Sequence, residues 1–271
     1  MRELPTRWRI QNSRCVELYL VHSERSATSR RCDIFLGQSR ASGCYRGRIR
    51  RDPRHHRHAR RRASAEAGSH SGTGARIVTY DRAKEDREAI GQRIAGETGA
   101  TVVPPYDHPW TIAGQGTAAL ELLAEVPDLD ALVVPVGGGG LISGSSIAAH
   151  AIHPGIRVFG VEPEQGNDTL LSFRAGERMG IPLPETIADG LRATKPGAFT
   201  FPIVRQHVED IFLVTDEEIR NAMKFLLTRM KILVEPSGAA SAAAVMHGKL
   251  PSGNPNIGVI LSGGNVDLDC V

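Results

Sequence analysis

The sequence has few cysteines, no long apolar run and no apolar segment at its start. Its four cysteines (Cys15, Cys32, Cys44 and Cys270) show no CxxC spacing, so they predict neither a zinc site nor a disulfide framework. No stretch of about 18 apolar residues predicts a membrane span, and residues 1–10 lack the apolar region of a signal peptide. These absences favour a globular protein of the cytoplasm, where thiols stay reduced.

Residues 1–75 contain no lysine, although they contain seventeen arginines and three of the four cysteines. The first lysine of the chain is Lys84. From residue 76 onward the charges are mixed, and apolar residues recur at helical and strand spacing. The chain is therefore predicted to consist of two different kinds of sequence that meet near residue 75.

Strands and helices are predicted to alternate from residue 76 to the end of the chain. Residues 76–104 are predicted to form a β-α-β unit, and Thr215 with Glu218 has the spacing of a capping box that begins a helix. This alternation predicts a parallel sheet with helices on both faces. The further predicted elements are a helix at 112–126 entered through a glycine turn, strands at 129–136, 156–163 and 256–265, a helix at 142–153, a strand opening the segment 210–236, and a small-residue helix at 237–247.

Four consecutive glycines, Gly137 to Gly140, follow the strand predicted at 129–136 and precede a helix. Such a turn directs backbone N–H groups and the positive end of the helix dipole at an anion, usually a phosphate. The loop has neither the G-x-G-x-x-G spacing nor the Lys-Ser/Thr pair of a Walker A motif. It predicts a phosphate site at the carboxyl end of a strand; a tight turn without a ligand is the alternative.

Six motifs carry a resemblance to a known family. They are IAGQGTAALELL, PVGGGGLISG, VFGVEPEQGND, ETIADGL, KILVEPSGAA and VILSGGNVDL. With them, residues 76–271 resemble the serine racemase and serine–threonine dehydratase (threonine ammonia-lyase) family, whose enzymes depend on pyridoxal 5'-phosphate (PLP). The resemblance implies the α/β fold of tryptophan synthase β (PLP fold type II), in incomplete form. Residues 76–107 would be a remnant of the small β-α-β domain, and residues 108–271 part of the large PLP-binding domain.

The resemblance also implies a set of residues around the cofactor. Ser262 would hydrogen-bond the pyridine nitrogen, and a neutral hydroxyl does not hold a proton on the ring as a carboxylate would, which suits α-proton loss and β-elimination. The residues expected to cradle the phosphate are Gly137, Gly138, Gly139, Gly140 and Leu141. Gly190 and Glu235 would border the cofactor; a turn glycine and a solvated acid are the alternatives for these two.

The motif VEPEQGND matches the divalent-cation site of the family. Glu162, the carbonyl of Gly166 and Asp168 would bind Mg²⁺ or Ca²⁺, both of which prefer oxygen ligands. An ordinary acidic loop is the alternative. Tyr106 stands where some relatives have a polar residue near the cofactor, which leaves the substrate preference open. The two histidines at 150 and 153 are interpreted as helix-end residues without a role.

The chain lacks the lysine that this family needs. The family places its Schiff-base lysine in a motif like S/A-F-K-x-R-G-A, followed by S-S-G-N-H, whose asparagine contacts the cofactor ring. Neither motif is present, and none of the five lysines stands in a matching context. No catalytic residue is therefore assigned.

A shifted reading frame would explain the missing motifs. Read one base later, MRELPTRWRIQNSRC permits a sequence containing G-A-F-K-I-R-G-A, with the lysine codon straddling Gln11 and Asn12, and RCDIFLGQSRAS permits F-S-S-G-N-H. The hypothesis is that residues 1 to about 72 are out of frame and that the proper frame resumes near residues 72–75. It predicts that this segment is largely disordered and lacks a native-like core.

Three functions follow from these interpretations. The first is a PLP-dependent ammonia-lyase that converts serine or threonine to a 2-oxo acid and ammonia, or a serine racemase, with a homodimer implied by the resemblance. The second is a catalytically dead fragment or pseudogene product. The third is nucleic-acid binding through the basic run at 46–62, which has no interleaved aromatic residues; an arginine-rich transit peptide is a weaker reading of the same region.

Overall fold

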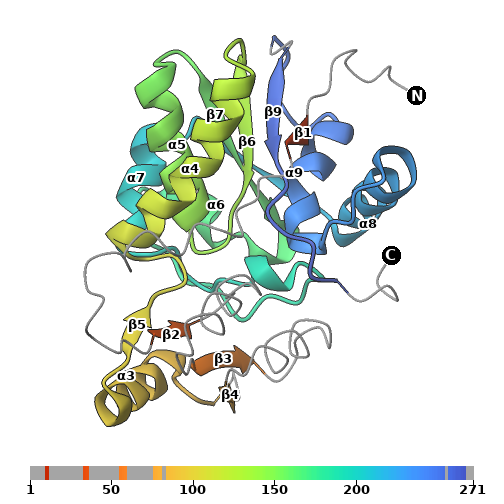
Figure 1. Ribbon diagram of the computed structural model, residues 1–271. Helices are drawn as coiled ribbons and strands as arrows, with labels where there is room; N and C mark the ends of the chain where they lie inside the picture. The colour runs from red at the N-terminus through yellow and green to blue at the C-terminus, as the bar shows by residue number, and fades with distance from the viewer. Residues whose placement is uncertain are drawn as a thin grey trace.

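Two parallel β-sheets organise the protein (Figure 1). The computed structural model describes residues 10–11, 33–36, 55–59, 76–80, 84–253 and 256–266. The larger sheet has the strand order β1-β9-β6-β7-β8, and the smaller sheet has the order β4-β3-β2-β5. Every pair of neighbouring strands is parallel. The predicted α/β architecture with a parallel sheet is confirmed.

The larger sheet has helices on both faces. The strands are β1 (Ile10–Gln11), β6 (Ala131–Pro135), β7 (Arg157–Pro163), β8 (Asp210–Val214) and β9 (Ile257–Ile260). On one face lie α4 (Pro109–Glu125), α5 (Gly140–Ile152), α6 (Asp168–Ala175) and α7 (Thr200–His207), and on the other lie α8 (Asp216–Phe225) and α9 (Pro236–Met246). Short helical turns connect them: η2 (Glu164–Gly166), η3 (Asp189–Leu191) and the π-helical η4 (Leu226–Met230).

The central strand β6 divides the core into two apolar layers. Val133 packs in the layer beneath α8 and α9, whereas Leu132 and Val134 pack beneath α4 and α5, as the alternation of side chains along a strand requires. Every residue of β6 is buried. The small-residue helix α9 lies close to the sheet because residues 236–245 are all buried without bulky side chains. Burial of both faces of β6 accounts for its continuous apolar sequence.

Two glycines allow α4 and α5 to cross closely. A side chain at Gly116 would begin less than 3.0 Å from the carbonyl oxygen of Gly144, and one at Gly144 would overlap the carbonyl of Ile112. The prediction that α4 begins near residue 112 after a glycine turn is wrong. The helix begins at Pro109, with the His108 Nδ1 accepting a hydrogen bond from the Trp110 N–H at 3.2 Å, and its glycines serve the helix crossing.

The predicted capping box at the start of α8 is confirmed. The Thr215 hydroxyl accepts a hydrogen bond from the Glu218 N–H at 3.1 Å, and the Glu218 carboxylate accepts one from the Thr215 N–H at 2.9 Å. The same side chain pairs with the Lys249 ammonium at 2.8 Å. The box therefore also ties the start of α8 to the segment that follows α9.

The smaller sheet contains the predicted β-α-β elements and two strands more. The predicted elements are β4 (Arg76–Tyr80), α3 (Arg87–Thr98) and β5 (Thr101–Val103), but β4 and β5 lie at opposite edges of the sheet. Between them lie β2 (Asp33–Leu36) and β3 (His55–Ala59), and β3 belongs to the basic run at 46–62. Most of residues 1–72 lies outside the described residues, so the predicted disorder there stays a prediction.

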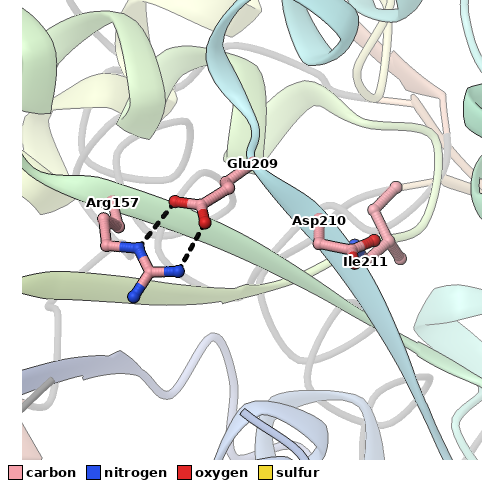
Figure 2. A network of polar contacts seen from close by, with 4 residues as sticks. All are labelled: Arg157, Glu209, Asp210 and Ile211. Carbon is pink, nitrogen blue, oxygen red and sulfur yellow. Dashed lines mark hydrogen bonds and ion pairs between the residues drawn. The ribbon is translucent and has the colours of Figure 1, made fainter. Parts of the chain in front are cut away.

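An ion pair joins β7 to β8 at the amino ends of these strands (Figure 2). The guanidinium of Arg157 donates two hydrogen bonds to the carboxylate of Glu209, one of them at 2.7 Å. Beside it, the Asp210 carboxylate accepts hydrogen bonds from its neighbour, the Ile211 N–H, at 2.7 Å and from Arg174 at 2.6 Å. These charges lie at the sheet edge opposite the glycine loop, so they hold the strands without taking part in the site.

The part of the chain that the structure describes contains no helix with the length and apolar character that a membrane span requires.

Gly144→Ala is expected to lower the free energy of unfolding by about 1–3 kcal/mol, because the added methyl group forces α4 and α5 apart. Gly96→Ala is the matched control, since Gly96 lies in α3 with no atom within 4 Å of the added carbon. It should raise the stability by about 0.5–1 kcal/mol. Urea unfolding of both variants measures the difference; an equal effect at the two positions would contradict the close crossing.

Candidate cofactor site

The predicted site residues lie along the carboxyl edge of the larger sheet. Val133 pairs with Val259 and Pro135 with Val161, so the same registers bring Val136 abreast of Ser262 on one side and Glu162 on the other. Ligands of parallel α/β sheets bind at this edge. Ser262, the glycine loop and the acidic loop, which lie far apart in sequence, are therefore neighbours at one edge.

The glycine loop leads from β6 directly into α5. Gly139 is the N-cap residue and has φ of 91°, a left-handed conformation that favours glycine. The first bond of the helical ladder is donated by the Ser143 N–H to the Gly139 carbonyl at 3.0 Å. The N–H groups of Gly140, Leu141 and Ile142 precede this ladder and lie at the positive end of a 13-residue helix. This arrangement suits a phosphate group.

Packing by neighbouring segments explains why four glycines are needed. An added Cβ would come within 3.0 Å of the Gly190 carbonyl oxygen at Gly137, of the Tyr106 ring at Gly138, of Thr200 at Gly139 and of the Tyr106 backbone at Gly140. Side chains are therefore excluded along one side of the loop by the protein itself. The bare backbone N–H groups remain as its binding surface, so the residues present fit a phosphate-bearing cofactor.

Gly190, Glu235 and Ser262 are brought together around the end of β9. The Glu235 N–H donates to the Gly263 carbonyl at 3.0 Å, and its carboxylate accepts a hydrogen bond from the Asn265 N–H at 3.0 Å. Glu235 therefore fixes the turn after Ser262, which argues against the alternative of a freely solvated acid. The Gly190 N–H donates to the Ser237 hydroxyl at 2.9 Å, while the Gly190 carbonyl lies against the glycine loop.

The acidic loop buries two carboxylates side by side. The Glu162 carboxylate accepts hydrogen bonds from the Thr169 and Leu170 N–H groups at the start of α6, at 3.1 and 2.8 Å. Burial, reinforced by the charge of Asp168, raises the pKa of Glu162 well above its usual value. Asp168 is fully buried, and neither of its carboxylate oxygens has a hydrogen-bond partner. Burial raises the pKa of Asp168 to about 7.

A cation would neutralise this uncompensated acid. Among the described residues there is no group of three or more His, Cys, Asp or Glu side chains that could hold a metal ion. A cation would therefore need carbonyl oxygens as well as carboxylates, and the η2 turn places Gly166 between Glu162 and Asp168 in the chain. Oxygen donors of this kind suit Mg²⁺ or Ca²⁺.

None of the five lysines of the chain is buried beside Ser262. Four of them are exposed, and Lys249 is bound to Glu218. The lysine codon of the shifted frame straddles Gln11 and Asn12. In the structure Gln11 forms part of β1 and pairs with Ile260, two residues before Ser262. The backbone position at which the frame hypothesis places the lysine therefore adjoins the site.

Sequence patterns did not single out Asp107, Thr200 or Ser237, all of which contact the site. Asp107 and Thr200 are 93 residues apart and interact directly, so no local spacing could connect them. Ser237 lies within the motif KILVEPSGAA, but only its hydrogen bond to Gly190 reveals what it does. The two histidines at 150 and 153 lie at the end of α5, as predicted.

The fold and the glycine loop are typical of α/β proteins whose ligands bind at the carboxyl ends of the strands of a parallel sheet. The family described as "Pyridoxal-phosphate dependent enzyme" matches residues 71–263. The chain belongs to this family.

Known proteins and a solved structure are similar to this chain. The L-threo-3-hydroxyaspartate ammonia-lyase of Saccharomyces cerevisiae is 52% identical over 198 residues, 73% of this chain and 61% of that protein. The serine racemase of Schizosaccharomyces pombe is 49% identical over 205 residues, 76% and 64% of the two chains. The structure of maize serine racemase has a TM-score of 0.82 and 39% identity, and the match covers 89% of this chain and 75% of that one. The chain spans about three-fifths of the length of the curated relatives it matches.

The buried charge of Asp168 predicts a pH dependence of stability in a buffer that contains a chelator. An unperturbed aspartate has a pKa of 3.8, whereas the pKa of Asp168 is about 7 in the folded chain, so the folded state binds the extra proton between these values. Stability should fall as the pH rises through this window, by on the order of 2–4 kcal/mol, with the loss complete above about pH 7.

Asp168→Asn should make this fall smaller, because the amide carries no charge, while the buried Glu162, whose pKa is also raised, keeps its own contribution. Glu164→Gln removes an exposed acid from the same loop and should follow the native profile. Urea unfolding at about pH 4, 6 and 8 measures the three profiles. Parallel profiles for the native chain and Asp168→Asn would contradict an uncompensated charge at Asp168.

Proposed function

We propose that this protein is a PLP-dependent ammonia-lyase or racemase acting on hydroxy amino acids such as serine and threonine. The observation that carries the proposal is the glycine loop at the start of α5, which lies at the same sheet edge as Ser262. The named activities of the relatives, hydroxyaspartate ammonia-lyase and serine racemase, support the reaction class. An ammonia-lyase reaction eliminates the β-hydroxyl, and the product hydrolyses to a 2-oxo acid and ammonia.

Each part of the site would have a distinct task. The N–H groups of Gly137 to Leu141 would bind the cofactor phosphate and fix its position. Ser262 would donate to or accept from the ring nitrogen as a neutral partner, with its turn held by Glu235. When bound, PLP would withdraw electrons from the α-carbon and so acidify its proton. Gly190 and Glu235 would border the cofactor, and the Gly190 carbonyl lies against the glycine loop at Gly137.

The chain as written lacks the family's lysine motif, whose lysine would remove that proton. The family match begins at residue 71, near the point where the frame hypothesis lets the family sequence resume. We infer that residues 1 to about 72 are out of frame and that turnover belongs to the chain with the frame restored. The chain as written would then retain the phosphate site and be catalytically inactive.

A divalent cation is proposed at Glu162, the Gly166 carbonyl and Asp168. The supporting observation is the buried carboxylate of Asp168, whose oxygens have no hydrogen-bond partner. A cation with oxygen ligands would neutralise it and hold the start of α6 against β7.

A cytoplasmic homodimer is proposed as well. The exposed apolar side chains Leu120, Ile147 and Ile152 on α4 and α5 support contact between copies.

Restoring the frame is expected to raise the rate of 2-oxo acid formation by at least about a hundredfold, because a positioned base contributes that much or more. The measurement compares the two chains with PLP and with serine, threonine or L-threo-3-hydroxyaspartate as substrate. Borohydride reduction followed by peptide mapping should find PLP on the restored lysine and none on residues 1–75 of the chain as written, which contain no lysine.

Re-sequencing the gene from upstream of Met1 to the codon of Ala75 tests the frame hypothesis directly. A restored base would bring the lysine and asparagine motifs into frame. An unchanged sequence together with normal turnover by the chain as written would contradict both the hypothesis and the need for that lysine.

Millimolar Mg²⁺ or Ca²⁺ is expected to raise the melting temperature of the native chain at pH 8, because a ligand that binds only the folded state stabilises it. At a hundred times the Kd the gain is about 2.7 kcal/mol. Asp168→Asn should abolish the shift, and Glu164→Gln should keep it. A shift of equal size in all three chains would place the cation elsewhere.

A further inference from the structure

Contacts from two other segments of the chain, around Asp107 and around Thr200, hold the glycine loop in place. The carbonyl of Gly138 accepts a hydrogen bond from the Thr200 hydroxyl at 2.7 Å and a longer one from the Gly197 N–H at 3.4 Å. Thr200 is the first residue of α7, is fully buried and lies 62 residues further along the chain. One side chain of α7 therefore fixes the orientation of a peptide group in the loop.

The direction of this hydrogen bond determines the direction of an N–H group. A trans peptide is planar, and its C=O and N–H point to opposite sides. Because the Gly138 carbonyl is directed at Thr200, the N–H of Gly139 is directed away from α7. Without this bond the peptide between two glycines could rotate, since neither residue has a Cβ to restrict it.

Asp107 in turn holds the start of α7. Its carboxylate accepts three hydrogen bonds, from the N–H groups of Ala198, Phe199 and Thr200, at 2.7, 2.8 and 3.2 Å. The side chain of the N-cap residue Phe199 offers no acceptor, so an acid from 91–93 residues earlier replaces the cap. A side chain at Gly197 would overlap this carboxylate, which explains the glycine there.

Tyr106 completes the contact on the other side of the same peptide. An added Cβ on Gly138 would meet three atoms of the Tyr106 ring at less than 3.0 Å, so the ring lies against the bare Cα. Tyr106 precedes Asp107 in the chain, so one short segment supplies both contacts. We call Tyr106, Asp107 and Thr200 the loop brace.

We infer that the loop brace is a positioning device for phosphate binding, with Asp107 and Thr200 as positioning residues that orient the Gly139 N–H. The inference rests on the proposed function. Neither residue needs to touch the cofactor. Their effect passes through α7 to the Gly138 carbonyl and so to the next N–H in the loop.

The test uses pyridoxine 5'-phosphate and pyridoxine, which lack the aldehyde of PLP and cannot bond to surface lysines. Calorimetric titration of the full chain should show tighter binding of the phosphate ester. Thr200→Val should weaken that binding about tenfold, as the loss of one hydrogen bond predicts, and leave pyridoxine binding unchanged. Thr200→Ser should restore it, because serine keeps the hydroxyl.

Thr228→Val is the matched control. It also removes a hydroxyl that donates to a backbone carbonyl, that of Lys224 at 2.6 Å, but on the exposed surface of η4. Its binding of both compounds should equal that of the native chain. A general loss of stability would weaken binding of both compounds, whereas the inferred role affects the phosphate ester alone.

Hydrogen exchange of the ligand-free chain supplies a second readout. The peptide containing residues 137–142 should exchange faster in Thr200→Val and Asp107→Asn than in the native chain and in Thr228→Val. If the native chain binds no phosphate ester, the proposed function fails. If, in addition, residues 137–142 exchange at the native rate in Thr200→Val and Asp107→Asn, the loop brace is overturned as well. If the native chain binds and Thr200→Val binds equally tightly, the brace is overturned while the proposed function stands.

Discussion

The close packing around the β6–α5 junction is the constraint on which the rest of the site depends. From Gly137 to Gly140 every added Cβ would meet a neighbouring segment within 3.0 Å, and Gly144 extends the restriction into α5. The neighbours come from Tyr106, Gly190 and Thr200, so three distant parts of the chain converge on one loop. The glycine run proposed to bind a phosphate is therefore also the place where α5 packs against α4, α7 and the segment around Gly190.

The electrostatic environment differs between two parts of this carboxyl edge of the larger sheet. The phosphate side offers N–H groups and the positive end of α5, whereas the end of β7 buries Glu162 and Asp168. Glu162 accepts hydrogen bonds from two N–H groups of α6, which offset only part of the effect of burial on its pKa, whereas the oxygens of Asp168 have no hydrogen-bond partner. A buried carboxylate without a partner is costly, so Asp168 is expected either to take up a proton or to bind a cation. The two halves of the edge are thus suited to ligands of opposite charge.

Local patterns in the sequence were sufficient for most of the fold from residue 76 onward. Apolar periodicity predicts β6, β7, β8 and β9 of the larger sheet, but not β1, and the capping box at Thr215 marks the start of α8. The start of α4 was misjudged because its glycines, read as a turn, serve a helix crossing that only tertiary packing reveals. The order β4-β3-β2-β5 has no local signal, since it depends on pairing between strands distant in sequence.

The residues of the candidate site likewise fall into two groups, those with a local sequence signal and those without one. The glycine loop and the acidic loop are continuous in sequence and could be recognised, whereas the contact of Asp107 with α7 spans about ninety residues. This separation also bears on function. The contacts around the glycine loop lie between residues 106 and 200, whereas the frame hypothesis assigns the lysine for turnover to the position of Gln11 and Asn12. Under the proposed function, cofactor binding and catalysis would therefore depend on separate parts of the chain, and the first could persist where the second is lost.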